Sequence, residues 1–122
     1  MWSIKQGTLE AVLLAAKNTF PNEFFCLLGG NKKEKIVGEF VVIPAVFGKQ
    51  HTMVQDWLKP IDRKIVGSMH SHPSRNNFPS SADLNSFPRF GEIHLIVGYP
   101  FRLGDAKLFD LKGKKIEFEV VE

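Results

Sequence analysis

The sequence has few cysteines, and it has no long apolar run. It contains 122 residues and a single cysteine, Cys26, which excludes an internal disulfide and a four-cysteine metal site. A lone cysteine favours a reducing compartment. The longest apolar run, residues 40–47, is interrupted by Pro44 and is too short to span a membrane, and the N-terminus lacks the basic-then-apolar pattern of a secretion signal. We therefore predict a cytoplasmic protein with no membrane partner.

A strong excess of one charge is also absent, and the sequence is only mildly basic. The sequence has 16 Lys and Arg against 13 Asp and Glu, for a net charge of +3. The lysines cluster at residues 32–35 and 112–115, next to glycines, which is typical of solvated turns. Acidic residues are interspersed and no RNA- or DNA-binding motif occurs, so we expect no nucleic-acid partner.

The remaining composition is that of an ordinary folded domain. Hydrophobic residues make up 43% and charged residues 24%, and the eleven phenylalanines indicate a dense core. This length suits one domain and leaves no room for a second, so we predict a single domain over residues 1–122.

Hydrophobic periodicity predicts a helix followed by short strands and a second helix. Thr8 is expected to cap a first helix of about twelve residues that ends at Pro21. Its predicted apolar face consists of Leu9, Val12, Leu13, Ala16 and Phe20. Ser80 to Asp83 begin the second helix, which Pro88 should shorten or bend and Gly91 should end.

Strands are predicted at residues 24–28, 36–43, 52–57, 64–70, 93–99, 106–111 and 115–121. The first two should form a hairpin through a turn at residues 29–31. Residues 93–99 are almost continuously apolar, as in a strand covered on both faces. In the last strand Ile116, Phe118 and Val120 alternate with glutamates, which predicts one buried face. The fold class is therefore α/β, a mixed β-sheet sandwiched by helices.

One short stretch collects the residues that bind metals. His70 and His72 are two apart, so on a strand both rings point to the same side. Pro73 then turns the chain, and Asp83 follows at the start of the second helix. Two imidazoles and a carboxylate make three ligands and leave the fourth position of a tetrahedral zinc ion for water.

Other interpretations of these residues stay open. Two histidines two apart occur by chance, and the same ligand set suits an Fe(II) enzyme. Ser80-x-x-Asp83 is also the capping-box pattern, with Asp in place of Glu. The two roles of Ser80 are compatible, because its oxygen can accept from the Asp83 N–H while its own O–H donates elsewhere.

His70-Ser71-His72-Pro73 followed by Ser80-x-x-Asp83, with an upstream Glu, resembles the signature of the JAMM (MPN+) metalloproteases. The resemblance covers essentially the whole chain, as in a minimal stand-alone prokaryotic member. It implies a cytidine deaminase-like fold and a hydrolase with one zinc ion per chain on His70, His72 and Asp83. It also identifies Glu23 as the family's glutamate, with Glu39 as the fallback.

The resemblance implies a reaction and a substrate. Glu23 would act as general base, and Ser80 would stabilise the oxyanion. The bond cut would be a peptide or isopeptide bond after the C-terminal Gly-Gly of a ubiquitin-like modifier, so the partners would be conjugates of such a protein. Arg75 and residues 76–78 either line the path of the substrate or form a solvated loop.

Two further alternatives concern a binding role and the oligomeric state, and three other residues have expected places in the fold. A domain of this type can act as a binding scaffold without hydrolysis, although this chain retains the metal residues. The first helix or an edge strand could serve a homodimer. We expect Cys26 to be a small core residue and His94 to be a hydrogen-bonded core histidine, while His51 falls in a loop.

Overall fold

The computed structural model describes residues 1–42 and 64–122. Along the chain it contains β1 (Trp2–Lys5), α1 (Gln6–Thr19), β2 (Phe25–Asn31), β3 (Ile36–Val42), β4 (Ile65–His72), α3 (Ser81–Phe90), β5 (Ile93–Gly98), the short 3₁₀ helix η2 (Leu103–Asp105), β6 (Ala106–Phe109), β7 (Lys115–Ile116) and β8 (Phe118–Val121). The strand predicted at residues 52–57 and the loop position of His51 lie outside the described residues.

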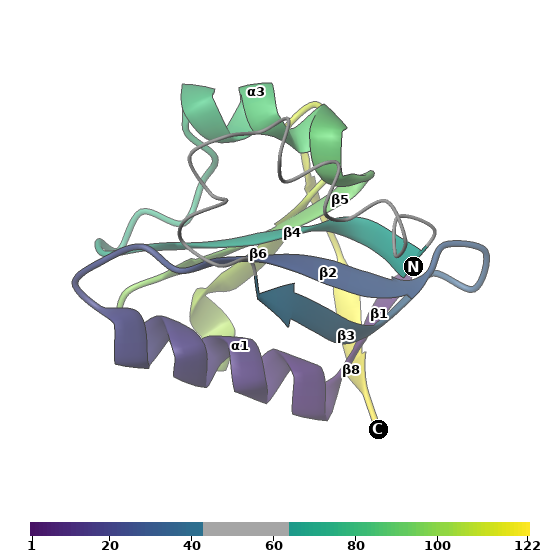
Figure 1. Ribbon diagram of the computed structural model, residues 1–122, viewed down its shortest axis with the longest axis horizontal. Coiled ribbons are helices and arrows are strands. Elements are labelled where there is room, and N and C mark those ends of the chain that lie inside the picture. The colour runs from purple at the N-terminus through teal and green to yellow at the C-terminus, as the bar shows by residue number, and fades with distance from the viewer. Residues whose placement is uncertain (43–63) are drawn as a thin grey trace.

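The strands form a mixed sheet between two helices. The order is β7-β6-β5-β4-β2-β3-β1-β8. The β4–β5 pair is parallel, as are the two pairs that β1 makes, with β3 and β8, and the remaining pairs are antiparallel. The helix α1 covers one face of the sheet and α3 covers the other (Figure 1). The predicted fold class, a mixed sheet sandwiched by helices, is confirmed.

The two ends of this sheet are adjacent in the chain. Only Glu117 separates β7 from β8, although these strands lie at opposite ends of the strand order. The sheet must therefore curl toward a barrel to bring its ends together. The single strand predicted at 115–121 is wrong, because it is two strands. Val120 was expected on the buried face but is 39% exposed, and it lies on β8 at the edge of the sheet.

The N-terminal prediction needs two corrections. α1 begins at Gln6 after Lys5, so Thr8 lies inside the helix and does not cap it. The short strand β1 precedes the helix, and its alternation of buried Trp2 and Ile4 is too brief to give a periodic signal. The helix ends at Thr19, near the predicted position. Phe20 therefore leaves the helical face.

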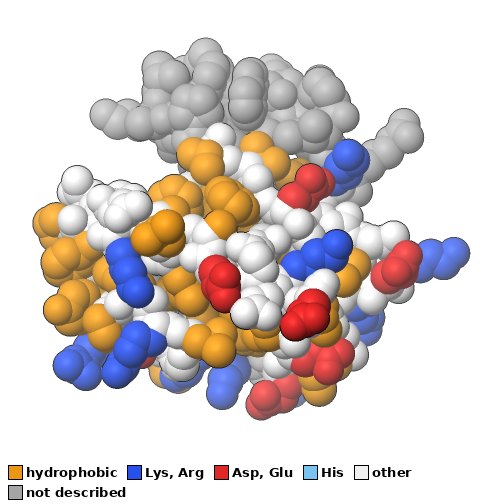
Figure 2. Space-filling model, turned by 90° about the horizontal axis from the view of Figure 1, so that it is seen from below, with side chains coloured by type: hydrophobic (Ala, Val, Ile, Leu, Met, Phe, Trp, Pro, Cys, Tyr) orange, Lys and Arg blue, Asp and Glu red, His pale blue; other side chains and the backbone are white. Residues whose placement is uncertain are grey.

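Phe20 instead joins an aromatic cluster at the surface. It is 43% exposed, and its ring lies 5.0 Å from that of Tyr99 and 5.8 Å from that of Phe101. Viewed from the α1 side, hydrophobic side chains gather toward the end of the molecule where α1 ends (Figure 2).

The larger core lies between α1 and the sheet. It contains Leu9, Val12 and Ala16 of the helix, together with Cys26. These side chains are almost fully buried, and the burial of such apolar area is the main stabilising contribution to the fold. The smaller clusters on the α3 side contain Phe87 and Phe90. β5 is buried at every position, as predicted.

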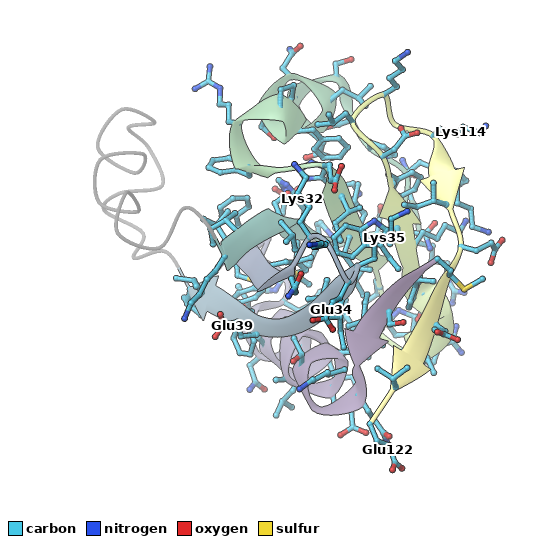
Figure 3. All side chains as sticks on the ribbon, turned by 90° about the vertical axis from the view of Figure 1, so that its right-hand side faces the viewer. Lys32, Glu34, Lys35, Glu39, Lys114 and Glu122 are labelled. Atoms are coloured by element: carbon cyan, nitrogen blue, oxygen red, sulfur yellow. The ribbon has the colours of Figure 1, made fainter. Side chains whose placement is uncertain are left out.

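The β2–β3 hairpin is confirmed, but its turn lies at residues 32–35 instead of 29–31. Gly30 belongs to β2, where a Cβ atom would lie 1.9 Å from the carbonyl oxygen of Ile36, so only glycine fits this close approach. Lys32 and Lys35 lie at this turn beside Glu34, while Lys114 lies apart at the turn before β7 (Figure 3). The two lysine clusters therefore do not share one turn.

The second helix follows the prediction at both ends. Ser80 is its N-cap and Gly91 its C-cap, with a φ of 124° that favours glycine. Pro88 is exposed and does not shorten the helix, which continues to the buried Phe90. Among residues 1–42 and 64–122, no helix is long and apolar enough to cross a membrane.

Candidate active site

The sequence-predicted site residues come together where β4 ends and α3 begins. His70 and His72 lie on the same side of β4, facing α3, and β2 begins beside them because Phe25 pairs with His70. This region is at the left-hand end of the sheet in Figure 1. The start of β2, which is distant in the sequence, therefore meets the end of β4 and the start of α3 at one place.

Asp83 lies between the two histidines. Its Oδ1 is 3.4 Å from Nδ1 of His70, and its Oδ2 is 3.1 Å from Nε2 of His72. The capping box is present as well, because Ser80 Oγ accepts from the Asp83 N–H and Asp83 Oδ2 accepts from the Ser80 N–H. The capping-box interpretation is confirmed, and the capping box holds the carboxylate so that it faces the histidines.

The backbone determines which nitrogen of His72 faces Asp83. Nδ1 of His72 lies 2.9 Å from the carbonyl oxygen of Asn76, which can only accept, so Nδ1 carries a proton. The other nitrogen, Nε2, is then free to bind a cation opposite the carboxylate of Asp83. The hydrogen bond to Asp83 raises the pKa of His72.

The charges of the triad fit a bound cation. Burial acts to raise the pKa of Asp83, but the hydrogen bonds from His72 and Ser80 outweigh it and lower this pKa to about 2. Burial lowers the pKa of His70 to about 4, so its ring is neutral at pH 7. The neutral ring of His70 and the ionised carboxylate of Asp83 are the protonation states that metal binding requires of these two groups.

The distances support the same fit. Two ligands of a tetrahedral zinc ion at about 2.05 Å lie about 3.3 Å apart, close to the two separations that Asp83 makes. Among the residues described, no three His, Cys, Asp or Glu side chains already surround one point as around a bound metal. In this arrangement Asp83 lies between the two rings and faces His70 and His72 through separate oxygens.

Glu23 lies beside this triad, just before β2. The Ser71 hydroxyl accepts from the Phe24 N–H at 2.6 Å, and the Ser71 N–H donates to the Phe24 carbonyl at 2.9 Å. These two bonds fix the segment that carries Glu23 against the end of β4. The carboxylate of Glu23 is exposed and close enough to contribute to the raised pKa of His72.

The fallback candidate Glu39 lies elsewhere. It pairs with Gly29, which in turn pairs with Ile65, five residues before His70 on β4. At about 3.4 Å per residue this places Glu39 roughly 17 Å along the sheet from the histidines. Of the two glutamates, the structure brings only Glu23 to the site.

The Ser80 hydroxyl lies at the edge of the site. Its oxygen accepts from the Asp83 N–H at 3.1 Å, and a hydrogen bond from the Ser80 side chain is among the causes that lower the pKa of Asp83. Ser80 is exposed, so its hydroxyl is accessible to a bound substrate. In the loop before Ser80, the Asn76 N–H donates to Ser74 Oγ and the Phe78 N–H donates to Asn76 Oδ1. Lys107 of β6 places its Nζ 4.1 Å from the centre of the exposed Phe78 ring.

Cys26 and His94 both lie in the core, as predicted. Burial raises the pKa of the Cys26 thiol to about 12, and its side chain belongs to the α1-side core. Burial lowers the pKa of His94 to about 4, which keeps its ring neutral. Its Nδ1 lies 2.6 Å from Ser68 Oγ, which is itself 3.1 Å from Nε2 of His70. Sequence reasoning missed Ser68 and its link between the two histidines.

Comparison with known proteins now identifies the family. Residues 5–111 match the family of prokaryotic homologs of the JAB domain. The chain belongs to this JAMM/MPN family. It is 32% identical over 128 residues to a probable metalloprotease of Haloferax volcanii, covering 98% of this chain and 79% of that one.

Solved structures agree with this assignment. A JAB1/MPN domain protein from Archaeoglobus fulgidus is 40% identical, with a TM-score of 0.79 over 98% of this chain and 99% of that one. A structure described as a metalloprotease-like zinc site in the proteasome and signalosome is 36% identical, also with a TM-score of 0.79, over 100% and 99%. A Desulfitobacterium hafniense protein at 22% identity shares the fold, with a TM-score of 0.67 over 100% and 94%. The JAMM family is one of metalloprotease-like hydrolases.

Proposed function

We propose that this JAMM-family protein is a zinc-dependent hydrolase that cleaves peptide or isopeptide bonds after the C-terminal Gly-Gly of a ubiquitin-like modifier. The observation that carries the proposal is the position of Asp83, whose two oxygens face Nδ1 of His70 and Nε2 of His72. The likeness to a probable metalloprotease supports hydrolysis as the reaction class.

The ion would be held by His70 Nδ1, His72 Nε2 and the Asp83 carboxylate. Zinc bound there would lower the pKa of a water ligand to about 7 and polarise the scissile carbonyl. Zinc is favoured over iron because a related structure at 36% identity is described as containing a zinc site.

Glu23 is the proposed general base. Its carboxylate is exposed next to His72, where it can accept a proton from the attacking water. The carbon–oxygen bond forms as this proton moves to Glu23. When the carbon–nitrogen bond breaks, Glu23 returns the proton to the departing amine, so that the base ends each turnover unprotonated.

Ser80 is the proposed donor to the carbonyl oxygen. Its Oγ is fixed by the N–H of Asp83, and its exposed hydroxyl can donate to the carbonyl oxygen of a bound substrate. A donor fixed in advance stabilises the negative charge that develops on this oxygen, which is worth about 10²–10³ in rate.

The Gly-Gly specificity rests on the family likeness and on simple sterics. Two glycines have no side chains, so a Gly-Gly tail can approach the histidines closely while the larger modifier stays outside. The exposed loop residues Arg75 and Phe78 border the end of β4 and are suited to contact the modifier.

The test is incubation with model conjugates that end in Gly-Gly, in isopeptide and linear form, analysed by mass spectrometry. We expect release of the modifier with a free Gly-Gly carboxylate and complete inhibition by a zinc chelator. The Glu23→Gln variant is the matched control, since it keeps the metal ligands. Cleavage at other sequences, or cleavage that survives chelation, would overturn the proposal.

A further inference from the structure

Behind His70 lies a row of buried polar groups that the proposed chemistry does not use. It consists of Ser68, His94 and the carbonyl group of Gly91. The side chains of Ser68 and His94 are both fully buried. Buried polar groups cost stability unless each hydrogen bond is made, and here every one is made.

The direction of each hydrogen bond follows from the carbonyl at the end of the row. The Gly91 oxygen lies 2.9 Å from Nε2 of His94 and can only accept, so Nε2 of His94 carries the proton. In a neutral ring the other nitrogen, Nδ1, is then bare and must accept. Its partner at 2.6 Å is the hydroxyl of Ser68, which therefore donates its single proton to His94.

Ser68 can then only accept from His70. With its proton committed to His94, the Ser68 oxygen at 3.1 Å from Nε2 of His70 receives the N–H of that nitrogen. Nδ1 of His70 is left unprotonated, and this is the nitrogen that faces Asp83 at 3.4 Å. The row therefore presents a lone pair of His70 to the metal position.

The ends of the row are held rigidly. The Glu92 N–H belongs to the same planar peptide unit as the Gly91 carbonyl and donates to the Val66 carbonyl oxygen at 3.0 Å, which fixes the direction of the Gly91 carbonyl. The ring of His94 stacks on Phe87 with 3.9 Å between the centroids and 1° between the planes. Ser68 and His94 are also direct neighbours in the β4–β5 register.

We propose that Ser68 and His94 are positioning residues that fix the ring orientation and proton of His70 so that its Nδ1 binds the metal ion. This inference rests on the proposed metal site, and it adds the residues that prepare one ligand. Groups that support a metal ligand in this way typically change metal affinity by about 10–100-fold.

Three variants test the row, with Zn²⁺ affinity measured by competition against a chromophoric chelator. Ser68→Ala removes the oxygen that accepts from Nε2 of His70, so the ring is no longer restrained, and we expect about 10-fold weaker Zn²⁺ binding. His94→Phe keeps the stacked ring but frees the Ser68 O–H to donate to His70 Nε2, which moves the His70 proton to Nδ1. We expect this variant to bind about 100-fold more weakly.

The double variant separates positioning from packing. Combining Ser68→Ala with His94→Phe removes the misdirected donor, so zinc affinity should recover about 10-fold, to the level of Ser68→Ala alone. A purely structural role predicts the opposite, a double variant weaker than either single one. Val66→Ala is the control, because it loosens the core on the same strand without touching the row, and it should keep wild-type affinity.

A second readout does not depend on zinc. Nitrogen-15 NMR of the metal-free wild type at pH 8 should show His70 protonated on Nε2 and bare on Nδ1, and His94→Phe should reverse this. Unchanged zinc affinity in both single variants, a double variant weaker than both, or a wild-type His70 protonated on Nδ1 would each overturn the inference. Failure of the wild type to bind zinc, with the NMR result as expected, would instead count against the proposed function.

Discussion

The two faces of the sheet differ in what they bury. On the α1 side the strands contribute an almost wholly apolar core, which includes the Cys26 thiol. On the α3 side the same strands contribute His70, His72 and His94, with Phe87 and Phe90 around them. Alternate residues of one strand serve the two faces, so Met69 is core while its neighbour His70 faces Asp83.

The difference shows how the fold separates stability from chemistry. The α1 face can supply most of the hydrophobic stabilisation, since its side chains need no hydrogen bonds. The α3 face contains polar groups whose positions are fixed by hydrogen bonds to the backbone or to one another. Substitutions on the α3 face should therefore change function more than stability, and those on the α1 face the reverse.

The largest effect is expected for Asp83→Ala. It removes the carboxylate between the histidines, so bound zinc should fall by more than the 10–100-fold typical of a supporting residue, and turnover should become undetectable. Metal analysis and the conjugate assay measure both. Since the change also removes half of the capping box, Leu84→Ala on the same helix serves as the control. Wild-type zinc content in Asp83→Ala would contradict the site.

Glu23→Gln should separate chemistry from metal binding. Turnover should fall by about 10²–10⁴-fold, because the amide cannot accept the proton of the attacking water. Zinc content and thermal stability should stay at the wild-type level, since the side chain is exposed. Glu39→Gln, on the distant part of the sheet, should leave turnover unchanged. Equal activity in the two variants would remove Glu23 from the mechanism.

Ser80→Gly distinguishes the cap from the oxyanion donor. Glycine is tolerated at an N-cap with a loss of only a few tenths of a kcal/mol, whereas Ser80→Ala should cost about 1 kcal/mol. Both variants lack the hydroxyl and should lose about 10²–10³ in turnover. Chemical denaturation and steady-state kinetics give the two readouts. Turnover that follows stability across the two variants would leave Ser80 as a cap alone.

A pH effect on stability should arise from the α3 face. Burial lowers the pKa of His94 to about 4, so between pH 6.5 and 4 the unfolded chain binds a proton that the folded chain does not. Stability is then lost as the pH falls through this range, by up to about 3 kcal/mol from this ring. In urea unfolding of the metal-free protein, His94→Phe should show a smaller loss than the wild type. An equal loss of unfolding free energy per pH unit in the two proteins would show that His94 does not cause this effect.

Local patterns were sufficient for much of the fold. The apolar run of β5 and the Ser80 and Gly91 signals of α3 lie within short stretches, so the sequence alone predicts them. The sequence does not predict β1, because four residues are too few to show a periodic pattern. It misplaces the hairpin turn, because Gly29 and Gly30 lie in β2, where strand packing requires glycine.

The site was predictable only in part. His70, His72 and Asp83 stand out through spacing and residue type, while Glu23 was found through the family likeness because an exposed Glu before a strand carries no signal of its own. Ser68 and His94 meet through the parallel register of β4 and β5, which pairs residues 26 positions apart. No local pattern reports such a contact.

The most direct test of the account is the metal K-edge X-ray absorption spectrum of protein purified without added metal, taken with the metal content per chain. The account predicts one zinc ion per chain with about four nitrogen and oxygen ligands at about 2.0–2.1 Å, two of them imidazoles, and loss of the ion in Asp83→Ala. A sulfur ligand, iron in place of zinc, or protein that binds no metal at all would contradict it.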